Sequence, residues 1–286
     1  GEALDSVYGH KKPEVRIPTR TYFTTFDYVI EEHSSYLEVI EKLPYRTSGK
    51  CLWLVKTLKD IETEIVGPVS VKEQIELIRM LKEKELQHIY VDGSLDRKSI
   101  ILSECIDNVY IVVNPDFGNF AKISKELNRL LIQQKFPLFT DNLHPGEKIS
   151  LFQKQEWQNI DISSIFSHES EIAVYLTKPE VEKIYFPGSL LENSFQKLKN
   201  DLINCQGEII FSHPYKLFLN FEQLAALKNR AKISFLHKPN FKAIAINSYS
   251  VKGNHVDCIS FRRKLREQFP KIPIIDIQEV NFAKRK

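Results

Sequence analysis

The residues best suited to chemistry lie in one short segment that follows an apolar run, Ile89-Tyr-Val91. This segment offers a carboxylate, a glycine and a charged cluster, in the order Asp92, Gly93, Asp96, Arg97 and Lys98. Phosphate-binding α/β proteins use a carboxylate at the end of a strand to organise a divalent metal ion. Asp92 could therefore hold Mg²⁺, while Arg97 and Lys98 contact a phosphate. The same pattern also suits a turn followed by solvated charges.

A phosphate loop that would complete this site is not found in the chain. The pattern GxxxxGK[ST] fails at Gly49-Lys50, because Pro44 stands where the first glycine should be and Cys51 where the hydroxyl should be. GxGxxG does not occur either. The chain begins with Gly1 and its only methionine is Met80, so we expect any such loop to lie upstream. ATP with Mg²⁺ is expected as a ligand only together with that upstream segment.

Two amide side chains follow other predicted strands. Asn114 comes directly after 109–113 and Asn247 directly after 243–246. Ligands of parallel sheets bind beyond the carboxyl ends of the strands, so both asparagines could line the crevice that Asp92 faces. Asparagine also ends strands by forming turns, and this is the commoner role.

Histidines and cysteines show no spacing typical of a metal centre or a disulfide framework. The four cysteines lie far apart in the sequence, HExxH and CxxC are absent, and no GxSxG elbow indicates an acyl-transfer nucleophile. His213 follows the predicted strand 208–211 and could act as a general base, although a lone histidine is more often structural. This cysteine usage fits a reduced compartment, and we expect a cytoplasmic protein.

The composition is that of an ordinary globular protein. Hydrophobic residues make up 42% and charged residues 27% of the 286 residues. A net charge of +3 is too small to predict nucleic acid as a partner. No apolar run approaches the roughly 18 residues of a membrane span, and the amino end is polar, so no membrane partner is predicted. The basic run Arg262-Arg-Lys264 with Arg266 indicates a solvated helix face or, less commonly, a surface for an acidic partner.

Apolar periodicity predicts strands that alternate with helices. Strands are predicted at 15–18, 22–26, 51–55, 62–66, 88–92, 109–113, 183–186, 208–211, 233–236, 243–246 and 272–275. Helices are predicted at 69–86, 120–134, 191–202, 221–229 and around Phe261 and Leu265, the first with a capping box of Ser70 and Glu73. This alternation favours an α/β fold, a mostly parallel sheet with flanking helices in a three-layer architecture like that of P-loop NTPases or Rossmann domains.

Residues 141–170 are polar, contain Pro145 and Gly146, and show no long periodic run. We therefore predict three parts. Residues 1–140 form a P-loop-like α/β half without a Walker A motif, 141–170 form a connector, and 171–286 form a second α/β half.

Five segments together resemble one protein family. They are Gly1–Pro18, Glu64–Pro68, Val91–Ser99, Ala245–Ser250 and Pro270–Asp276. In this order they resemble the reactivating-factor subunit associated with adenosylcobalamin-dependent lysine 5,6-aminomutase. The most specific piece is VDGxxDRKS. Members of that family look like P-loop proteins whose phosphate loop precedes a segment similar to Gly1-Glu2.

The resemblance implies an accessory subunit that helps an aminomutase release damaged cobalamin and admit intact coenzyme. The expected partners are the aminomutase and a second ATPase subunit, and nucleotide-linked protein binding would drive the exchange. Asp92 would be the metal-facing acid, with Arg97 and Lys98 as polar crevice residues. The alternative is a P-loop-type ligase or phosphotransferase, of the dethiobiotin-synthetase type, whose phosphate loop lies upstream of this chain. A scaffold without a ligand is a third option.

Overall fold

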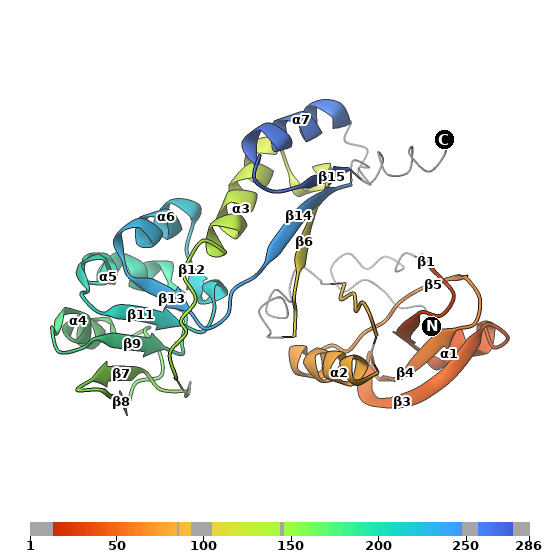
Figure 1. Cartoon of the computed structure of the whole chain (residues 1–286), viewed down its shortest axis with the longest axis horizontal. Helices are drawn as coiled ribbons and strands as arrows, with labels where there is room; N and C mark the ends of the chain where they lie inside the picture. The colour runs from red at the N-terminus through yellow and green to blue at the C-terminus, as the bar shows by residue number, and fades with distance from the viewer. Residues whose placement is uncertain (1–13, 85, 93–104, 144–145, 248–256, 277–286) are drawn as a thin grey trace. The chain divides into compact units, whose positions relative to one another are not determined.

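The computed structural model describes residues 14–84, 86–92, 105–143, 146–247 and 257–276. These residues form an α/β protein with seven α-helices and both parallel and antiparallel sheets (Figure 1). The fold class expected from the sequence is confirmed at this level. Contacts between Cα atoms divide the chain into two compact units, Gly1–Ile100 and Ile101–Lys286. None of the helices in the described ranges combines the length and the apolar character that crossing a bilayer requires.

Unit 1 is built from antiparallel strands and two helices. Its main sheet has the order β2-β4-β3, and β1 pairs with β5 in a separate ribbon. The bounds are β1 Val15–Ile17, β2 Tyr22–Thr25, α1 Asp27–Glu32, β3 Leu37–Thr47, β4 Lys50–Thr57, β5 Ile61–Thr63 and α2 Val71–Glu83. The helix expected at 69–86 and its capping box of Ser70 and Glu73 are confirmed. Buried residues of β4 serve both faces of the sheet, with Leu52 and Leu54 on one side and Val55 on the other.

Strand β3 is the longest strand described, and the sequence did not predict it. Its residues carry many charges and include Pro44, which lacks the N–H that an interior strand must donate. β3 tolerates this proline because it lies at the edge of its sheet and its register with β4 shifts between Lys42 and Arg46. The edge position and the register shift both depend on the partner strand β4. The sequence of β3 alone therefore could not predict this strand.

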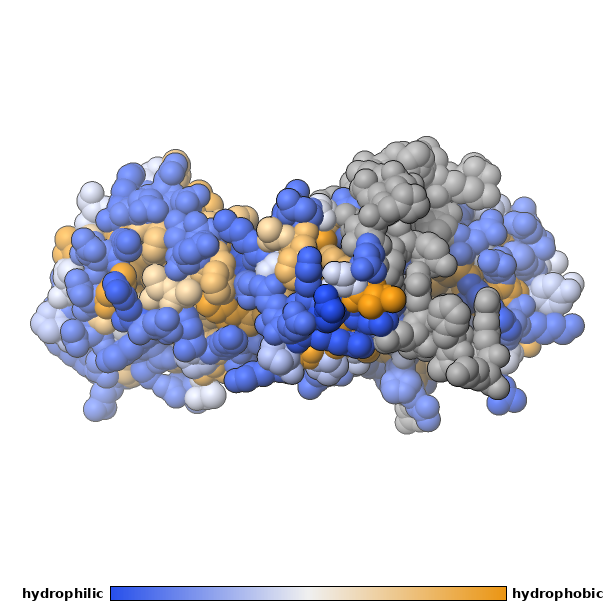
Figure 2. All heavy atoms as spheres, turned by 90° about the horizontal axis from the view of Figure 1, so that it is seen from above, coloured by the Kyte–Doolittle hydropathy of each residue, from blue (hydrophilic) through white to orange (hydrophobic). Residues whose placement is uncertain are grey.

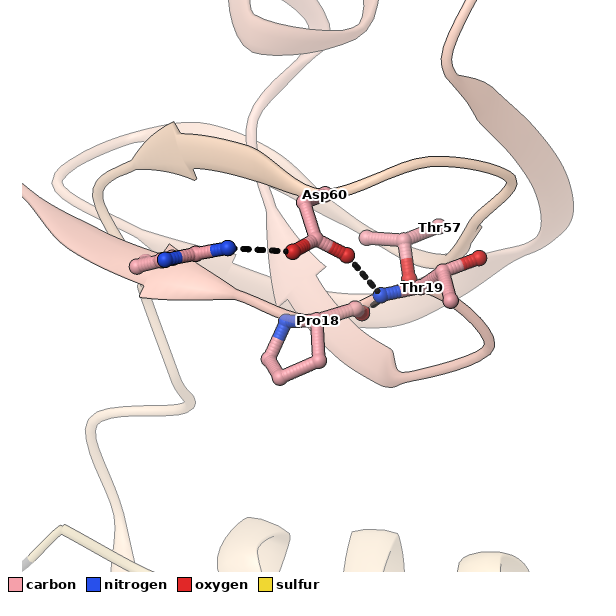
Figure 3. A network of polar contacts seen from close by, with 5 residues as sticks. Pro18, Thr19, Thr57 and Asp60 are labelled. Atoms are coloured by element: carbon pink, nitrogen blue, oxygen red, sulfur yellow. Dashed lines mark hydrogen bonds and ion pairs between the residues drawn. The ribbon is translucent and has the colours of Figure 1, made fainter. Parts of the chain in front are cut away.

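A carboxylate holds the turn between β4 and β5 against the end of β1. Asp60 accepts hydrogen bonds from the Arg16 guanidinium at 2.8 Å and from the Thr19 backbone N–H at 2.9 Å (Figure 3). The Thr57 hydroxyl donates to the Pro18 carbonyl at 2.6 Å in the same network. The hydrogen bond from Arg16 holds the pKa of Asp60 below its usual value. This network is structural, since its polar partners lie in β1, at the end of β4 and in the connections that join the strands of unit 1.

Unit 2 contains a three-stranded parallel sheet in the order β15-β14-β6. Helices α3 and α7 share its core, in which Leu127 and Leu265 pack with strand residues such as Ile244. The rings of Phe120 and Phe261 meet edge to face, 5.9 Å apart, where the two helices touch. The bounds are β6 Val109–Val113, α3 Phe120–Gln133, β14 Phe241–Ile246, α7 Cys258–Gln268 and β15 Ile274–Asp276. Helix α3, which follows β6, and helix α7, which connects β14 to β15, thus pack against this sheet.

A second sheet of unit 2 has the order β13-β11-β9-β7-β8, with β9, β11 and β13 parallel and β7 and β8 antiparallel. Helices α4, α5 and α6 lie together beside it (Figure 1). They bury residues such as Ile172, Leu198 and Leu224 in its core. The bounds are β7 Ser150–Gln153, β8 Glu156–Asn159, α4 Glu169–Thr177, β9 Lys183–Phe186, α5 Glu192–Asn204, β11 Glu208–Phe211, α6 Phe221–Arg230 and β13 Ile233–Phe235, with short bridging strands β10 Leu190–Leu191 and β12 Leu217–Phe218. Hydrophilic residues dominate the coloured surface in Figure 2, as expected when such apolar side chains are buried.

The division of the chain differs from the one predicted. The segment 141–170, expected to be a connector, contributes β7 and β8 to the second sheet and begins α4. Strand β6, expected in the first half, pairs with β14 of the second half. Parallel strands pair across long stretches of sequence, so periodicity reveals the strands without revealing their partners. The first hundred residues, expected to be P-loop-like, form antiparallel strands in the described part.

Candidate functional site

The structure does not place Asp92 at the end of a strand. Residues 86–92 have no regular secondary structure, and Tyr90, Val91 and Asp92 are exposed. The strand expected at 88–92 is therefore wrong: strand-forming residues need a neighbouring strand to complete their hydrogen bonds, and no described residue supplies one. The remaining candidates of this segment, Gly93, Asp96, Arg97 and Lys98, lie outside the described residues.

Asn114 and Asn247, by contrast, lie next to each other at the carboxyl ends of two paired strands. Val113 and Ile246 are partners in the β6–β14 ladder, and the Asn247 backbone N–H donates to the Val113 carbonyl at 2.9 Å. Each asparagine is the first residue beyond its strand and is half-buried. The pairing of β6 and β14 brings these two amides to one sheet edge, whereas Asp92, whose crevice they were expected to line, does not follow a strand. This edge is the position where open parallel sheets bind ligands.

The turn from β6 into α3 is held by side-chain hydrogen bonds. The Asn114 Oδ1 accepts from the Asp116 backbone N–H at 3.0 Å, and Asn119 caps α3 by accepting from the Lys122 N–H at 3.0 Å. Gly118 lies between them with φ of 135°, a conformation that favours glycine. The side chain of Asn114 is therefore engaged in shaping the turn, and it leaves its NH₂ group as the donor for a ligand.

The third strand contributes a buried carboxylate to the same edge. Asp276 ends β15 beside Ile246 of β14, and its side chain is only 2% exposed. The Arg262 guanidinium of α7 donates to its Oδ2 at 3.0 Å. Arg266 of the same helix donates to the Ile274 carbonyl at 3.2 Å. The basic run of α7, expected to be a solvated face, is therefore divided: Arg263 and Lys264 are exposed, whereas Arg262 is half-buried in an ion pair.

Asp276 and Arg262 were missed as site residues, although a signal existed. Asp276 follows the apolar residues Ile274-Ile275, and this is the pattern on which Asp92 was chosen. The pattern alone cannot distinguish the two aspartates, because both follow strand-like residues. Only the pairing of β15 with β14 shows that Asp276, unlike Asp92, ends a strand of a sheet.

The chemistry available at this edge is recognition by hydrogen bonds. Two amides, a carboxylate and a guanidinium lie at the ends of three adjacent strands, and together they can bind a polar ligand that presents both donors and acceptors. The described residues contain no group of three or more histidines, cysteines or acids that could hold a metal ion. The donor set of this edge therefore does not by itself provide the oxygen ligands that Mg²⁺ requires, and the Mg²⁺ role of Asp92 stays a prediction.

His213 lies at the carboxyl end of β11, as the sequence indicated, but it is not alone. His237 follows the neighbouring strand β13, and its backbone N–H donates to the Ser212 carbonyl at 2.9 Å. Burial, with smaller contributions from Lys216 and His237, lowers the pKa of His213 to about 4. His213 is therefore a neutral imidazole at physiological pH.

Comparison of the chain with protein-family models, curated proteins and solved structures finds no match in any of the three.

Proposed function

We propose that this protein is an accessory binding protein that responds to a nucleotide, in the manner of the reactivating-factor subunit that its sequence resembles. The observation that carries the proposal is the position of Asn114 and Asn247 at the ends of neighbouring parallel strands. Such an edge accepts ligands with mixed donors and acceptors, which describes the base and ribose of a nucleotide.

The finer architecture is part of this proposal. A three-layer arrangement of the P-loop or Rossmann kind is supported by the consecutive parallel units β9-α5-β11 and β11-α6-β13, and by β14-α7-β15. In such folds the phosphate loop follows a strand and cradles the phosphates with backbone N–H groups. We propose that an upstream segment supplies this loop, while the described edge binds the remainder of the nucleotide.

The proposed action is a shift of population between two shapes of the protein. A nucleotide that binds one shape more tightly shifts the population toward that shape, by the difference between its binding free energies for the two shapes. The aminomutase would bind the same shape. This subunit then makes and breaks no bond itself. By the resemblance, the consequence for the aminomutase is the exchange of damaged cobalamin for intact coenzyme, together with a second ATPase subunit.

Calorimetric titration with ATP and Mg²⁺, on this chain and on a form extended upstream, tests the nucleotide site. Asn247→Ala should weaken binding by roughly tenfold, which corresponds to about 1.4 kcal/mol for one lost pair of hydrogen bonds. Asn240→Ala is a matched control, because Asn240 is an exposed amide at the opposite, amino end of the same strand β14. Equal effects of the two substitutions, or no binding by either form, would refute the nucleotide site.

A second measurement separates the accessory role from catalysis. Size-exclusion chromatography with an adenosylcobalamin-dependent aminomutase should show a complex whose amount depends on ATP. Hydrolysis of ATP by the extended form with a small acceptor, in the absence of any protein partner, would favour a ligase or phosphotransferase instead.

A further inference from the structure

A second polar site lies at the carboxyl edge of the other parallel sheet, where three short segments of unit 2 converge. One is the end of α3. The second is the one-turn helix η3, Pro214–Lys216, which follows β11 and His213. The third is the segment after β13, whose Lys238 ammonium donates to the carbonyls of Gln134 at 3.1 Å and Phe136 at 2.9 Å. These bonds fix the end of β13 against the end of α3.

Tyr215 brings η3 to the same face of α3. The charges of Arg129 and Glu126 both act on its hydroxyl, so the ring lies near these two residues of the helix. Arg129 is held by Glu126 in a two-pronged pair at 2.6 and 2.7 Å. Gln133 lies four residues beyond Arg129 and therefore projects from the same face of the helix, one turn further on.

The polar atoms gathered here are buried and lack partners. Within the described residues, both amide atoms of Gln133, the hydroxyl of Tyr215 and the Nδ1 of His213 are buried without a hydrogen bond, and Gln133 is completely buried. Native proteins leave few buried polar groups unsatisfied, because each loses its water without gaining a partner. His213 and Tyr215 follow the end of β11, and Gln133 ends α3, whose carboxyl end Lys238 holds near the end of β13, so these groups indicate a place where a polar ligand completes the hydrogen bonds.

The charge around this edge favours an anion. Lys216 acts on His213, whereas Arg129 acts on Tyr215 together with Glu126, the carboxylate that pairs with it, so Lys216 supplies the uncompensated positive charge of this edge. Burial raises the pKa of Tyr215 to about 12, so its hydroxyl keeps the proton that it can donate. A metal ion fits poorly, since the described residues offer no group of three ligands and the nearby cations would repel it.

We propose that His213, Tyr215, Gln133 and His237 form a binding site for a phosphate group, distinct from the amide edge of β6 and β14. The imidazole, hydroxyl and amide groups donate hydrogen bonds to the phosphate oxygens, and Lys216 supplies the positive charge. The site uses the carboxyl ends of β11 and β13, the position at which parallel sheets bind ligands. It stands independently of the nucleotide proposal, because it uses no residue of that edge.

Titration of the whole chain with inorganic phosphate at constant ionic strength tests this site. Tyr215→Phe keeps the ring and removes only the hydroxyl, and His237→Ala removes an exposed imidazole, so neither threatens the fold. Each should weaken phosphate binding at least tenfold. The matched controls His168→Ala, an exposed histidine of the same unit bonded to the Phe166 carbonyl, and Asn247→Ala should leave it unchanged.

The proposal would be overturned by no phosphate binding by the unaltered chain, by equal binding by all four variants, or by stoichiometric Zn²⁺ binding that His237→Ala abolishes. Loss of phosphate binding in Asn247→Ala but not in Tyr215→Phe would also overturn it, because the phosphate would then belong to the amide edge.

Discussion

The two parallel sheets of unit 2 present opposite kinds of carboxyl edge. At the β6–β14–β15 edge the described polar side chains are engaged, Asn114 in its turn and Asp276 with Arg262. At the β11–β13 edge the Nδ1 of His213 and the hydroxyl of Tyr215 are buried without partners. The buried charged pair of the first edge is therefore satisfied internally, whereas buried polar atoms of the second edge lack partners.

This difference predicts which substitutions should change stability and which should change ligand binding. A hydrogen-bonded buried ion pair costs the fold heavily only when one partner is removed. An unpaired buried group costs the fold while the site is empty and contributes to affinity when a ligand completes its hydrogen bond. Substitutions in the Asp276–Arg262 pair of the first edge should therefore change stability most, and substitutions at the second edge should change phosphate binding most.

The largest expected effect is at the first edge. Asp276→Ala leaves the half-buried Arg262 guanidinium without its 3.0 Å partner, and we expect a loss of about 3–5 kcal/mol in the free energy of unfolding. Urea denaturation measures this loss. Replacing both residues by apolar ones, as in Asp276→Leu with Arg262→Met, should restore most of it. An effect of Asp276→Ala no larger than that of an exposed surface substitution such as Asp161→Ala would remove the contrast between the edges.

The second edge should respond to pH. The pKa of His213 is lowered to about 4 in the folded protein, whereas an unfolded histidine titrates near 6.5. The unfolded chain therefore binds the proton first as the pH falls, so stability decreases from about pH 6.5 to about pH 4. Allowing for partial exposure of the ring, we expect a loss of roughly 2 kcal/mol between pH 7.5 and pH 4.5.

Urea denaturation at the two pH values measures this dependence. His213→Gln should reduce the loss by most of that amount, whereas His168→Gln should not. If His213→Gln leaves the pH dependence unchanged, the imidazole is solvated in the folded protein. Its polar atoms would then have water as a partner, and the contrast with the satisfied ion pair of the first edge would disappear.

The features that could be predicted from the sequence are those determined by residues close together in the chain. Helix α2 with its Ser70 cap, helix α3 and the strands β6, β11 and β14 follow from periodicity and capping, which act within a few residues. The positions of Asn114 and Asn247 directly after strands were predicted because the rule for strand ends is also local. The two asparagines share an edge because β6 pairs with β14. This pairing joins residues more than 130 positions apart, and no local pattern encodes it.

The predictions that failed concern features that local sequence does not determine. Asp92 satisfied the local rule, yet no described strand pairs with its segment. The β7–β8 hairpin was taken for a connector because its segment is polar and lacks a long periodic run. Its turn at Lys154 and Gln155 adopts positive φ, which these residue types do not favour, so the sequence gives no sign of a hairpin there. Gln133 carried no signal, because a glutamine within a helix is expected to be exposed.

A smaller effect is expected where the second edge meets α3. Lys238→Met keeps most of the aliphatic stem but removes the ammonium that donates to the carbonyls of Gln134 and Phe136 at the end of the helix. Loss of a cation at a helix carboxyl end should cost about 1 kcal/mol. Lys135→Met at the same helix end is the control, and thermal unfolding measures both. Equal destabilisation by the two variants would show that charge near the helix end, rather than this contact, sets the position of the segment.

The smallest expected change has the opposite sign. Tyr215→Phe removes a buried hydroxyl that has no partner, so without phosphate the variant should be as stable as the unaltered chain or more stable by up to about 1 kcal/mol. With phosphate the order should reverse, because only the tyrosine gains a hydrogen bond from the ligand. Thermal unfolding with and without phosphate measures both signs in one experiment. Destabilisation of Tyr215→Phe without phosphate would mean that the hydroxyl already has a partner, such as an ordered water, and both edges would then be satisfied internally.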